Sequence, residues 1–418
     1  MSAAEPPAPD PPLTTGDLTF TWSRIWWLGT GILGVQLAFA LYNAFLPLLY
    51  REFIDSRALI GLLMGTDNLV GLLLIPVVGA WSDRTSTSLG RRLPFIMIGV
   101  PIAALTLLAI PFAAALLWTL ILTEIAFSAA MHTYRGPVAT MLLEHTPPRQ
   151  RSTASGIAQL LGSVGVLISF AGLALLFDRD RRLPFAVAAL VLLASLWVMW
   201  SKAERQPRFG GATAVAIVSP VHDTIGGLRN LGRPEQRPRL SILLSMLTAY
   251  VGFAGLQSMF PIYGVETLGL SEGRAAFLLT AFAGAFLLTA LAAGMLGSRW
   301  GWHTTMSIGL AALPVLYLVA VVADRPGHIL IILALIGGAW ALFAVPAIAA
   351  AAELGGADRL GFHIGLYYIF TMTGQMIGPV IVGAAMDLLG NRGMWVAAVL
   401  LTLLSLVLLR AGGTPRSR

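Results

Sequence analysis

The sequence predicts an all-α polytopic membrane protein, and three observations support this fold class. Apolar residues make up 57% of the 418 residues and charged residues only 11%, whereas charged residues make up about a quarter of soluble domains. Apolar runs long enough to cross a bilayer recur along the chain. The second half of the chain also repeats landmarks of the first. Polar groups are too few to cover a surface facing water, so the sequence predicts a protein solvated by lipid.

The apolar runs predict twelve transmembrane helices of roughly 19–28 residues, each adequate for a hydrocarbon core about 30 Å thick. The first six lie at about 25–50, 58–81, 93–113, 115–143, 152–177 and 183–201. The second six lie at about 239–264, 273–297, 302–323, 328–353, 360–388 and 392–410. The chain then divides into a tail, a six-helix half, a linker, a second six-helix half and a second tail, at 1–24, 25–201, 202–238, 239–410 and 411–418.

The polar segments outside the spans predict where the chain ends lie. Residues 1–24 are rich in proline and have no basic stretch before a short apolar run, so we expect a cytosolic tail and not a signal peptide. In the linker, Val221, Ile225 and Leu228 recur at helical spacing. A short helix lying in the membrane interface and a flexible connection both fit this pattern.

The positive charge predicts membrane topology. A net charge of +7 in a soluble protein would suggest a nucleic-acid partner, but here the arginines lie between spans and concentrate on the side of both termini. The positive-inside rule then places both termini in the cytoplasm of a multi-pass protein of the plasma (inner) membrane. We expect no nucleic-acid partner. The chain has no cysteine, which excludes disulfides and thiolate chemistry.

The loop between the second and third predicted spans carries the most specific motif. It reads Ser82-Asp-Arg-Thr85, then Gly90-Arg-Arg92 and Pro94-Phe95, with charges packed between two apolar runs. It resembles the loop between helices 2 and 3 of the major facilitator superfamily. Its lengthened form is similar to that of the sucrose–proton symporters and their glycoside–pentoside–hexuronide symporter relatives. This resemblance implies a major facilitator fold of twelve transmembrane helices in two six-helix repeats.

Further segments support the same resemblance. Tyr134–Glu144 looks like the fourth-to-fifth-span region of bacterial relatives of the sucrose symporters, and Gly365–Phe370 with Asp387 resembles their eleventh span. In the plant family an acid at the position of Glu144 is implicated in proton coupling. The sodium-coupled relatives carry an acid where Arg135 stands, so sodium coupling is not expected.

The two halves read as parallel repeats. Pro47 ahead of Glu52 matches Pro261 ahead of Glu266 at nearly equal offsets. Pro137, Glu144 and Arg151 likewise match Pro346, Glu353 and Arg359. Parallel repeats are typical of transporters that bind substrate between the halves near the membrane midplane.

Ionisable residues inside the predicted spans are candidates for proton coupling, because a charge in the bilayer is costly. They are Asp67, Glu124 and His132, and their counterparts in the second half are not ionisable. On an ideal helix Glu124 and Arg135 fall within about 40° of each other. Arg135, roughly 13 Å from the cytoplasmic end of its helix, needs a counter-ion or an anionic ligand. We expect an Arg135–Asp67 pair that serves transport; a static pair that only fixes helix packing is the alternative.

Polar groups at matching places in the first and seventh spans predict a substrate site. Gln36 and Asn43 lie on one side of the first span, and Tyr250 and Gln257 occupy the same offsets on the seventh. Amides offer donors and acceptors together, which suits hydroxyl-rich ligands, and Trp340 on the tenth span could stack on a sugar ring. We count these residues with Arg135 as substrate contacts. Bonds between neighbouring helices would explain the polar groups equally well.

Glu144 has two possible roles. Geometry turns it away from the Arg135 stripe, and Glu353 duplicates it, which favours a latch in the cytoplasmic charge network over a proton carrier. The cytoplasmic gate that we expect comprises Asp83, Arg84, Arg91, Arg92, Arg151, Glu353 and Arg359.

Together these features predict a secondary transporter, a proton-coupled importer of a disaccharide or other glycoside that works by alternating access. A proton-driven exporter of drugs or metabolites on the same fold is the alternative. The sequence contains no metal-ligand cluster, phosphate loop or nucleophile constellation, so we expect neither an enzyme nor a cofactor or metal. A sensor would need an added soluble domain. The expected partners are a small-molecule substrate, protons and lipid, and we expect a monomer.

Overall fold

The computed structural model describes residues 15–147, 150–202, 233–354 and 360–413, and within these ranges the regular structure is helical throughout. The first half contains α1 (Thr15–Arg51), α2 (Arg57–Arg84), α3 (Leu93–Ala113), α4 (Leu117–Glu144), α5 (Arg151–Leu167), the π-helical turn η2 (Ile168–Leu173), α6 (Ala174–Phe177) and α7 (Leu183–Lys202). The second contains η3 (Pro234–Gln236), α9 (Arg237–Glu266), α10 (Glu272–Trp300), α11 (Trp302–Val322), α12 (Pro326–Glu353), α13 (Leu360–Leu389) and α14 (Gly393–Gly412). Most of the predicted linker lies outside the described residues.

The helices have the length and apolarity of membrane spans. In the described part of the chain, 11 helical segments are long and apolar enough to cross a membrane, counting Thr153–Phe177 as one. The helix α4 is equally long but more polar, because it carries Glu124, His132 and Arg135. The prediction of an all-α polytopic membrane protein is therefore confirmed.

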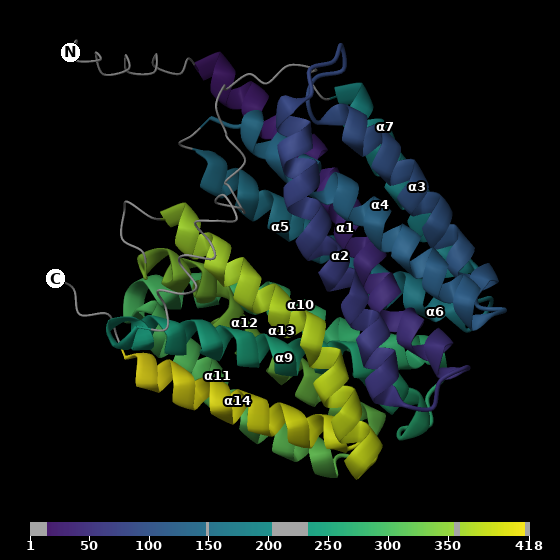
Figure 1. Ribbon diagram of the computed structural model, residues 1–418, viewed down its shortest axis with the longest axis vertical. Helices are drawn as coiled ribbons and strands as arrows, with labels where there is room; N and C mark the ends of the chain where they lie inside the picture. The colour runs from purple at the N-terminus through teal and green to yellow at the C-terminus, as the bar shows by residue number, and fades with distance from the viewer. Residues whose placement is uncertain (1–14, 148–149, 203–232, 355–359, 414–418) are drawn as a thin grey trace.

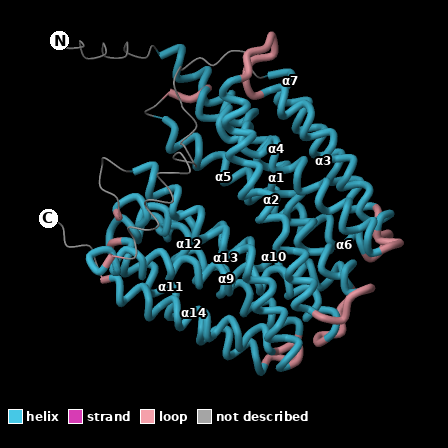
Figure 2. Tube along the Cα trace, in the orientation of Figure 1, coloured by secondary structure: helices cyan, strands magenta, loops and turns pink. Residues whose placement is uncertain are grey.

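The helices pack into two bundles (Figures 1 and 2). In the first bundle α1 packs on α5 and α7, and α3 packs on α4. In the second, α9 packs on α13 and α14, and α10 packs on α12. Between the bundles, α2 lies against α13, and α10 lies against α5, η2 and α6. These between-bundle pairs relate the second helix of each half to the fifth helix of the other half.

The apolar side chains that do not pack within the bundles face outward. Leu388, Leu288 and Trp118 expose 84%, 82% and 75% of their surface, far more than a water-soluble core helix would leave uncovered. This is the surface expected of helices solvated by lipid.

The polar contacts between the two bundles lie at one end of the molecule. We call that end, where residues 51–57, 114–116, 178–182, 267–271, 323–325 and 390–392 connect the helices, the distal face. Among the described residues, the hydrogen bonds and ion pairs between the halves all lie at this face. At the opposite, proximal face, where α1 begins and α14 ends, the bundles diverge toward both chain ends (Figure 1). The structure is therefore the distal-closed form of a two-bundle protein.

Candidate functional site

The most deeply buried acid of the first half is Glu124 on α4, which is 1% exposed. The Tyr42 hydroxyl donates to its Oε1 at 2.8 Å, and Tyr50 donates to its Oε2. Thr66 on α2 lies 3.1 Å from Oε1. Burying a carboxyl group requires hydrogen-bond partners because the lost hydration is costly. In this cluster all three partners are hydroxyl groups and none is a cation.

A second acid, Asp67 on α2, lies one residue along from Thr66. Its Oδ1 accepts a hydrogen bond from Ser128 at 2.6 Å and lies 3.2 Å from Nε2 of His132. Glu124, Ser128 and His132 lie at intervals of four on α4. One side of this helix therefore carries Glu124 and also supplies the two groups that contact Asp67. The His132 ring fits because the facing residue of α2 is Gly71: a Cβ there would lie 2.6 Å from Cε1 of the ring.

The structure places Arg135 apart from both acids, contrary to the expected Arg135–Asp67 pair. Its guanidinium lies 5.4 Å from the centre of the Phe39 ring on α1, and the residue is exposed. It shares the stripe of α4 that carries Glu124, Ser128 and His132, on the side that packs against α1 and α2. The expected pair was wrong because helical periodicity predicts the direction in which a side chain points but does not predict which neighbouring side chain contacts it.

The second half presents aromatic groups at the corresponding depth. The Trp340 indole stacks on Phe253 with ring centres 4.3 Å apart, and Tyr250 meets it edge-on at 5.2 Å. The Tyr250 hydroxyl lies 3.1 Å from that of Tyr367. Trp340 is 3% exposed, so in this conformation its rings pack on other side chains. Its predicted contact with a substrate therefore stays a prediction.

The remaining predicted substrate residues lie in different settings. Gln257 lines a small apolar pocket in the second bundle, beside Phe253, Phe260 and Trp395, and Phe170 of η2 enters this pocket from the first bundle. Gln36 and Asn43 are half-buried on α1.

The predicted cytoplasmic gate is assembled inside the first half only. Arg92, whose side chain is 4% exposed, pairs with Glu144 at 2.7 Å and also contacts Asp83 and Ser82. This cluster joins the end of α2, the start of α3 and the end of α4, as the latch reading of Glu144 requires.

The other predicted gate residues do not join this cluster. Arg84 and Arg91 are exposed, and the Nε of Arg151 is buried with no hydrogen-bond partner among the described residues. Glu353 accepts a hydrogen bond from Trp302 at 2.6 Å within the second half. Arg359 lies outside the described residues. Within the described ranges, the proximal gate groups thus form no hydrogen bond or ion pair between the bundles.

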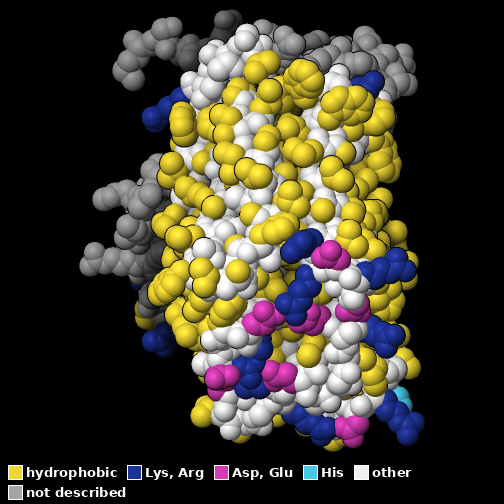
Figure 3. Space-filling view, turned by 90° about the vertical axis from the view of Figure 1, so that its right-hand side faces the viewer, with side chains coloured by type: hydrophobic (Ala, Val, Ile, Leu, Met, Phe, Trp, Pro, Cys, Tyr) yellow, Lys and Arg dark blue, Asp and Glu magenta, His cyan; other side chains and the backbone are white. Residues whose placement is uncertain are grey.

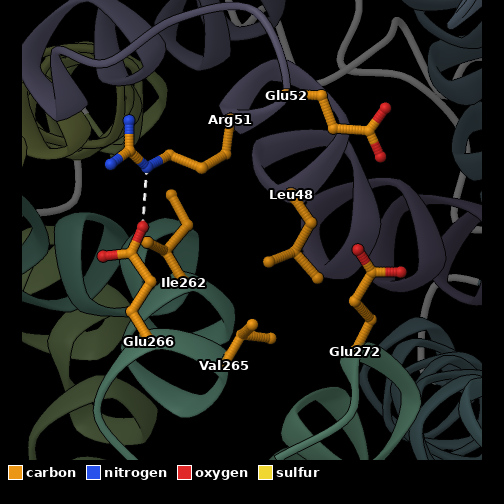
Figure 4. A pocket seen from close by; sticks show the side chains of 7 residues that line it. All are labelled: Leu48, Arg51, Glu52, Ile262, Val265, Glu266 and Glu272. Atoms are coloured by element: carbon orange, nitrogen blue, oxygen red, sulfur yellow. Dashed lines mark hydrogen bonds and ion pairs between the residues drawn. The ribbon is translucent and has the colours of Figure 1, made fainter. Parts of the chain in front are cut away.

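The distal face carries a charge network that sequence reasoning did not single out as a gate. Glu266 at the end of α9 accepts from Arg51 at 2.6 Å and from Arg57 at 2.5 Å, both in the first half. Arg181 contacts Glu272 of α10 at 3.2 Å. In Figure 4, Arg51 and Glu266 close one side of a small pocket. Figure 3, which views the right-hand side of Figure 1, shows acidic and basic side chains gathered in one region of an otherwise largely apolar surface.

A family comparison decides the classification. A family model described as the Major Facilitator Superfamily matches residues 28–279 and 242–418, which together take in most of the chain. The chain belongs to the major facilitator superfamily. The resemblance drawn from the loop after the second span is thus confirmed at the level of the superfamily.

Two curated relatives of this superfamily member are sugar transporters by name. Over 158 residues it is 27% identical to "Sucrose transport protein SUC3" of Arabidopsis thaliana, covering 33% of this chain and 27% of that protein. Over 104 residues it is 31% identical to "Proton-associated sugar transporter A" of Homo sapiens, covering 22% of this chain and 14% of that protein. The chain matches less than a third of the length of either relative.

Solved structures agree on the fold over nearly the whole chain. A bacterial homolog of the human lysosomal transporter Spinster, in an inward-facing and occupied conformation, has a TM-score of 0.73 at 14% identity, covering 94% of this chain and 96% of that one. The nucleoside transporter NupG, as its D323A mutant, has a TM-score of 0.72 at 14% identity, covering 93% and 100%. A major facilitator fold by itself specifies no substrate.

Proposed function

We propose that this protein is a secondary active transporter that imports a disaccharide or other glycoside together with protons, by alternating access of one central site. The proposal rests most on the polar cluster of α4, where two acids, Glu124 and Asp67, lie in the first half and have no ionisable counterpart in the second. Ionisable groups inside spans are costly to keep and mark ion or proton pathways. The partial identity to two proteins named as sugar transporters supports the substrate class.

The residues divide into two tasks in this proposal. Asp67 and His132 exchange the proton, since their contact is the one acid–imidazole pair of the cluster. Glu124 is a second proton-binding candidate held by Tyr42 and Tyr50. Arg135, which is exposed and lies on the same stripe of α4, contacts the substrate.

The proposal also assigns the orientation. The proximal face, where α1 begins and α14 ends, is cytoplasmic, and the distal face is external. The conformation described here is then open toward the cytoplasm. The cluster of Arg92, Glu144 and Asp83 belongs to the gate that closes in the opposite state.

One observation favours the alternative of drug or metabolite export. The pocket beside Gln257 is lined by aromatic and aliphatic side chains, including Phe253, Phe282 and Trp395. Such a lining suits an apolar ligand better than a sugar.

Uptake of labelled sucrose and maltose into proteoliposomes, with an imposed pH gradient, tests the proposal. We expect uphill uptake of at least one of these sugars with the gradient acid outside, and none without it. Gradient-driven loss of an apolar dye from loaded vesicles, with neither sugar transported, would favour export instead.

The site assignment has its own test. We expect Asp67→Asn to abolish proton-driven accumulation, because an amide cannot release the proton that the carboxyl carries, and Arg135→Ala to abolish it by removing a substrate contact. Asp180→Ala, at the distal face, is the control. Normal accumulation by both site variants, with normal insertion, would make these residues structural and refute the assignment.

A further inference from the structure

The N-terminus of α2 is completed by a residue of the other half. The first four N–H groups of a helix have no partner within it. In α2, the N–H of Leu59 donates to the side-chain oxygen of Ser56, the N-cap residue, and the N–H of Ile60 donates to the backbone oxygen of Ser56. The N–H groups of Arg57 and Ala58 instead donate to the two carboxylate oxygens of Asp387 on α13, at 2.9 and 3.0 Å.

The N-terminus of α10 is completed in the same way from the opposite direction. Asp178, which follows α6 in the first half, accepts at Oδ1 from the N–H of Gly273 at 2.8 Å. Its Oδ2 accepts from the hydroxyl of Ser271, the N-cap residue of α10, at 2.6 Å. The hydroxyl of the other N-cap residue, Ser56, donates to Asp387 at 2.9 Å.

The two arrangements are repeat equivalents. Each acid lies near the end of the fifth span of its own half, and each caps the second span of the other half. Each approach is also close enough to require glycine. A Cβ on Gly273 would lie 2.8 Å from Oδ2 of Asp178, and one on Gly383 would lie 2.3 Å from the backbone oxygen of Arg57.

We propose that Asp178 and Asp387 form a symmetric pair of latches that holds the distal face closed, each by capping a helix of the opposite half. A carboxylate at a helix N-terminus satisfies backbone donors and also meets the positive end of the helix dipole. When the distal face opens, both helices lose these partners and their donors must turn to water. The latches favour the distal-closed state whatever the substrate is, so the inference does not depend on the sugar assignment.

Spin-label distance measurements test the latches directly, because the chain has no native cysteine. One label pair, Arg179→Cys with Arg325→Cys, spans the halves at the distal face. A second pair, Ser86→Cys with Ser298→Cys, spans them at the proximal face. All four positions are exposed. In Asp178→Ala and in Asp387→Ala we expect the ratio of distal-open to distal-closed molecules to rise about tenfold, as for the loss of one helix cap.

The double variant should raise the ratio about a hundredfold, because distant sites act nearly additively. The distal distance should lengthen while the proximal distance shortens. Asp180→Ala and Asp324→Ala are matched controls, since each of these acids bonds within its own half. Unchanged distances in the double variant, or equal opening in the controls, would refute the latches.

Replacing Asp178 by asparagine removes the charge but keeps the capping groups, so it separates the two effects. It should also perturb folding less than Asp178→Ala. In Asp178→Asn the Oδ1 atom can still accept from Gly273, and the amide can donate to the Ser271 hydroxyl. We therefore expect this variant to stay within about threefold of the native ratio. If it opens as far as Asp178→Ala, the capping account is wrong. Loss of transport alone, with native distances, would instead count against the proposed function.

Discussion

At the scale of single residues, the hydroxyl groups around Glu124 are what sequence reasoning missed. Acids within apolar runs stand out, so Glu124, Asp67 and His132 could be chosen from the sequence alone. Tyr42 and Tyr50 could not, because a tyrosine in a membrane helix is equally compatible with core packing. Only the fold brings their hydroxyls to the carboxyl group.

The space beside His132 leads to a prediction about Gly71. In Gly71→Ala the new Cβ must displace the imidazole ring, which it would otherwise approach to 2.6 Å. Overpacking of this kind costs about 1–3 kcal/mol, and the displaced ring loses its contact with Asp67. We expect a lower Tm in detergent and an altered pH dependence of uptake.

Gly79→Ala on the same helix is the control for this prediction, because nothing lies within 4 Å of its added Cβ. It should leave both the Tm and the pH profile near those of the native protein. An equal loss in the two variants would mean that α2 tolerates no added methyl group, and the His132 ring would have no special part.

At the scale of helices, sequence periodicity anticipated most spans but not their irregular features. The predicted fifth span, 152–177, is a single rod in the structure, yet it contains the π-helical turn Ile168–Leu173. One extra residue in a turn barely alters an apolar pattern, so hydropathy cannot detect it. The fourth span, by contrast, is recognisable because its polar stripe interrupts an otherwise apolar helix.

The end of α4 leads to a prediction about the two possible roles of Glu144. Its carboxylate lies 2.7 Å from Nη2 of Arg92 and away from the cluster of Asp67. In Glu144→Gln, Arg92 loses one of its two acidic partners, and disrupting a buried pair costs about 3–5 kcal/mol. We expect a shift in the balance of inward and outward conformations while uphill transport remains coupled to protons.

Comparing uphill uptake with substrate exchange checks this prediction. Exchange and proton-driven uptake should change together in Glu144→Gln, because a latch affects both. Arg92→Gln removes the other partner of the same pair and should give the same result as Glu144→Gln. Loss of uphill uptake with exchange preserved would instead identify Glu144 as the proton carrier.

At the scale of the whole molecule, the repeat could be predicted but the conformation could not. Repeated positions such as Pro47 and Pro261 do not indicate which face is closed. In a rocking transporter each half keeps the same internal packing whichever face is closed. The distal network depends on residues such as Glu266 that read from sequence as ordinary loop charges. Which face is closed depends on pairings between the halves, and these have no signature in a single sequence.

The distal ion pairs should contribute less to closure than the caps. Glu266→Gln removes the charge that joins Arg51 to Arg57 and leaves two cations facing each other. A partly exposed pair contributes about 0.2–1 kcal/mol. Arg51 keeps Asp55 and Arg57 keeps Asp387 as a partner, so we expect a net loss within this range and a distal-open ratio that rises at most about fivefold, less than for loss of either cap. Raising the salt concentration should bring the distal-open ratio of Glu266→Gln closer to that of the native protein, because exposed charges are screened.

Glu52→Gln is the matched control, since Glu52 is the repeat equivalent of Glu266 but bonds to Arg181 of its own half. The same distal spin-label pair measures both variants, and an opening in Glu52→Gln as large as in Glu266→Gln would show that net charge, and not the bond between the halves, governs the distal face.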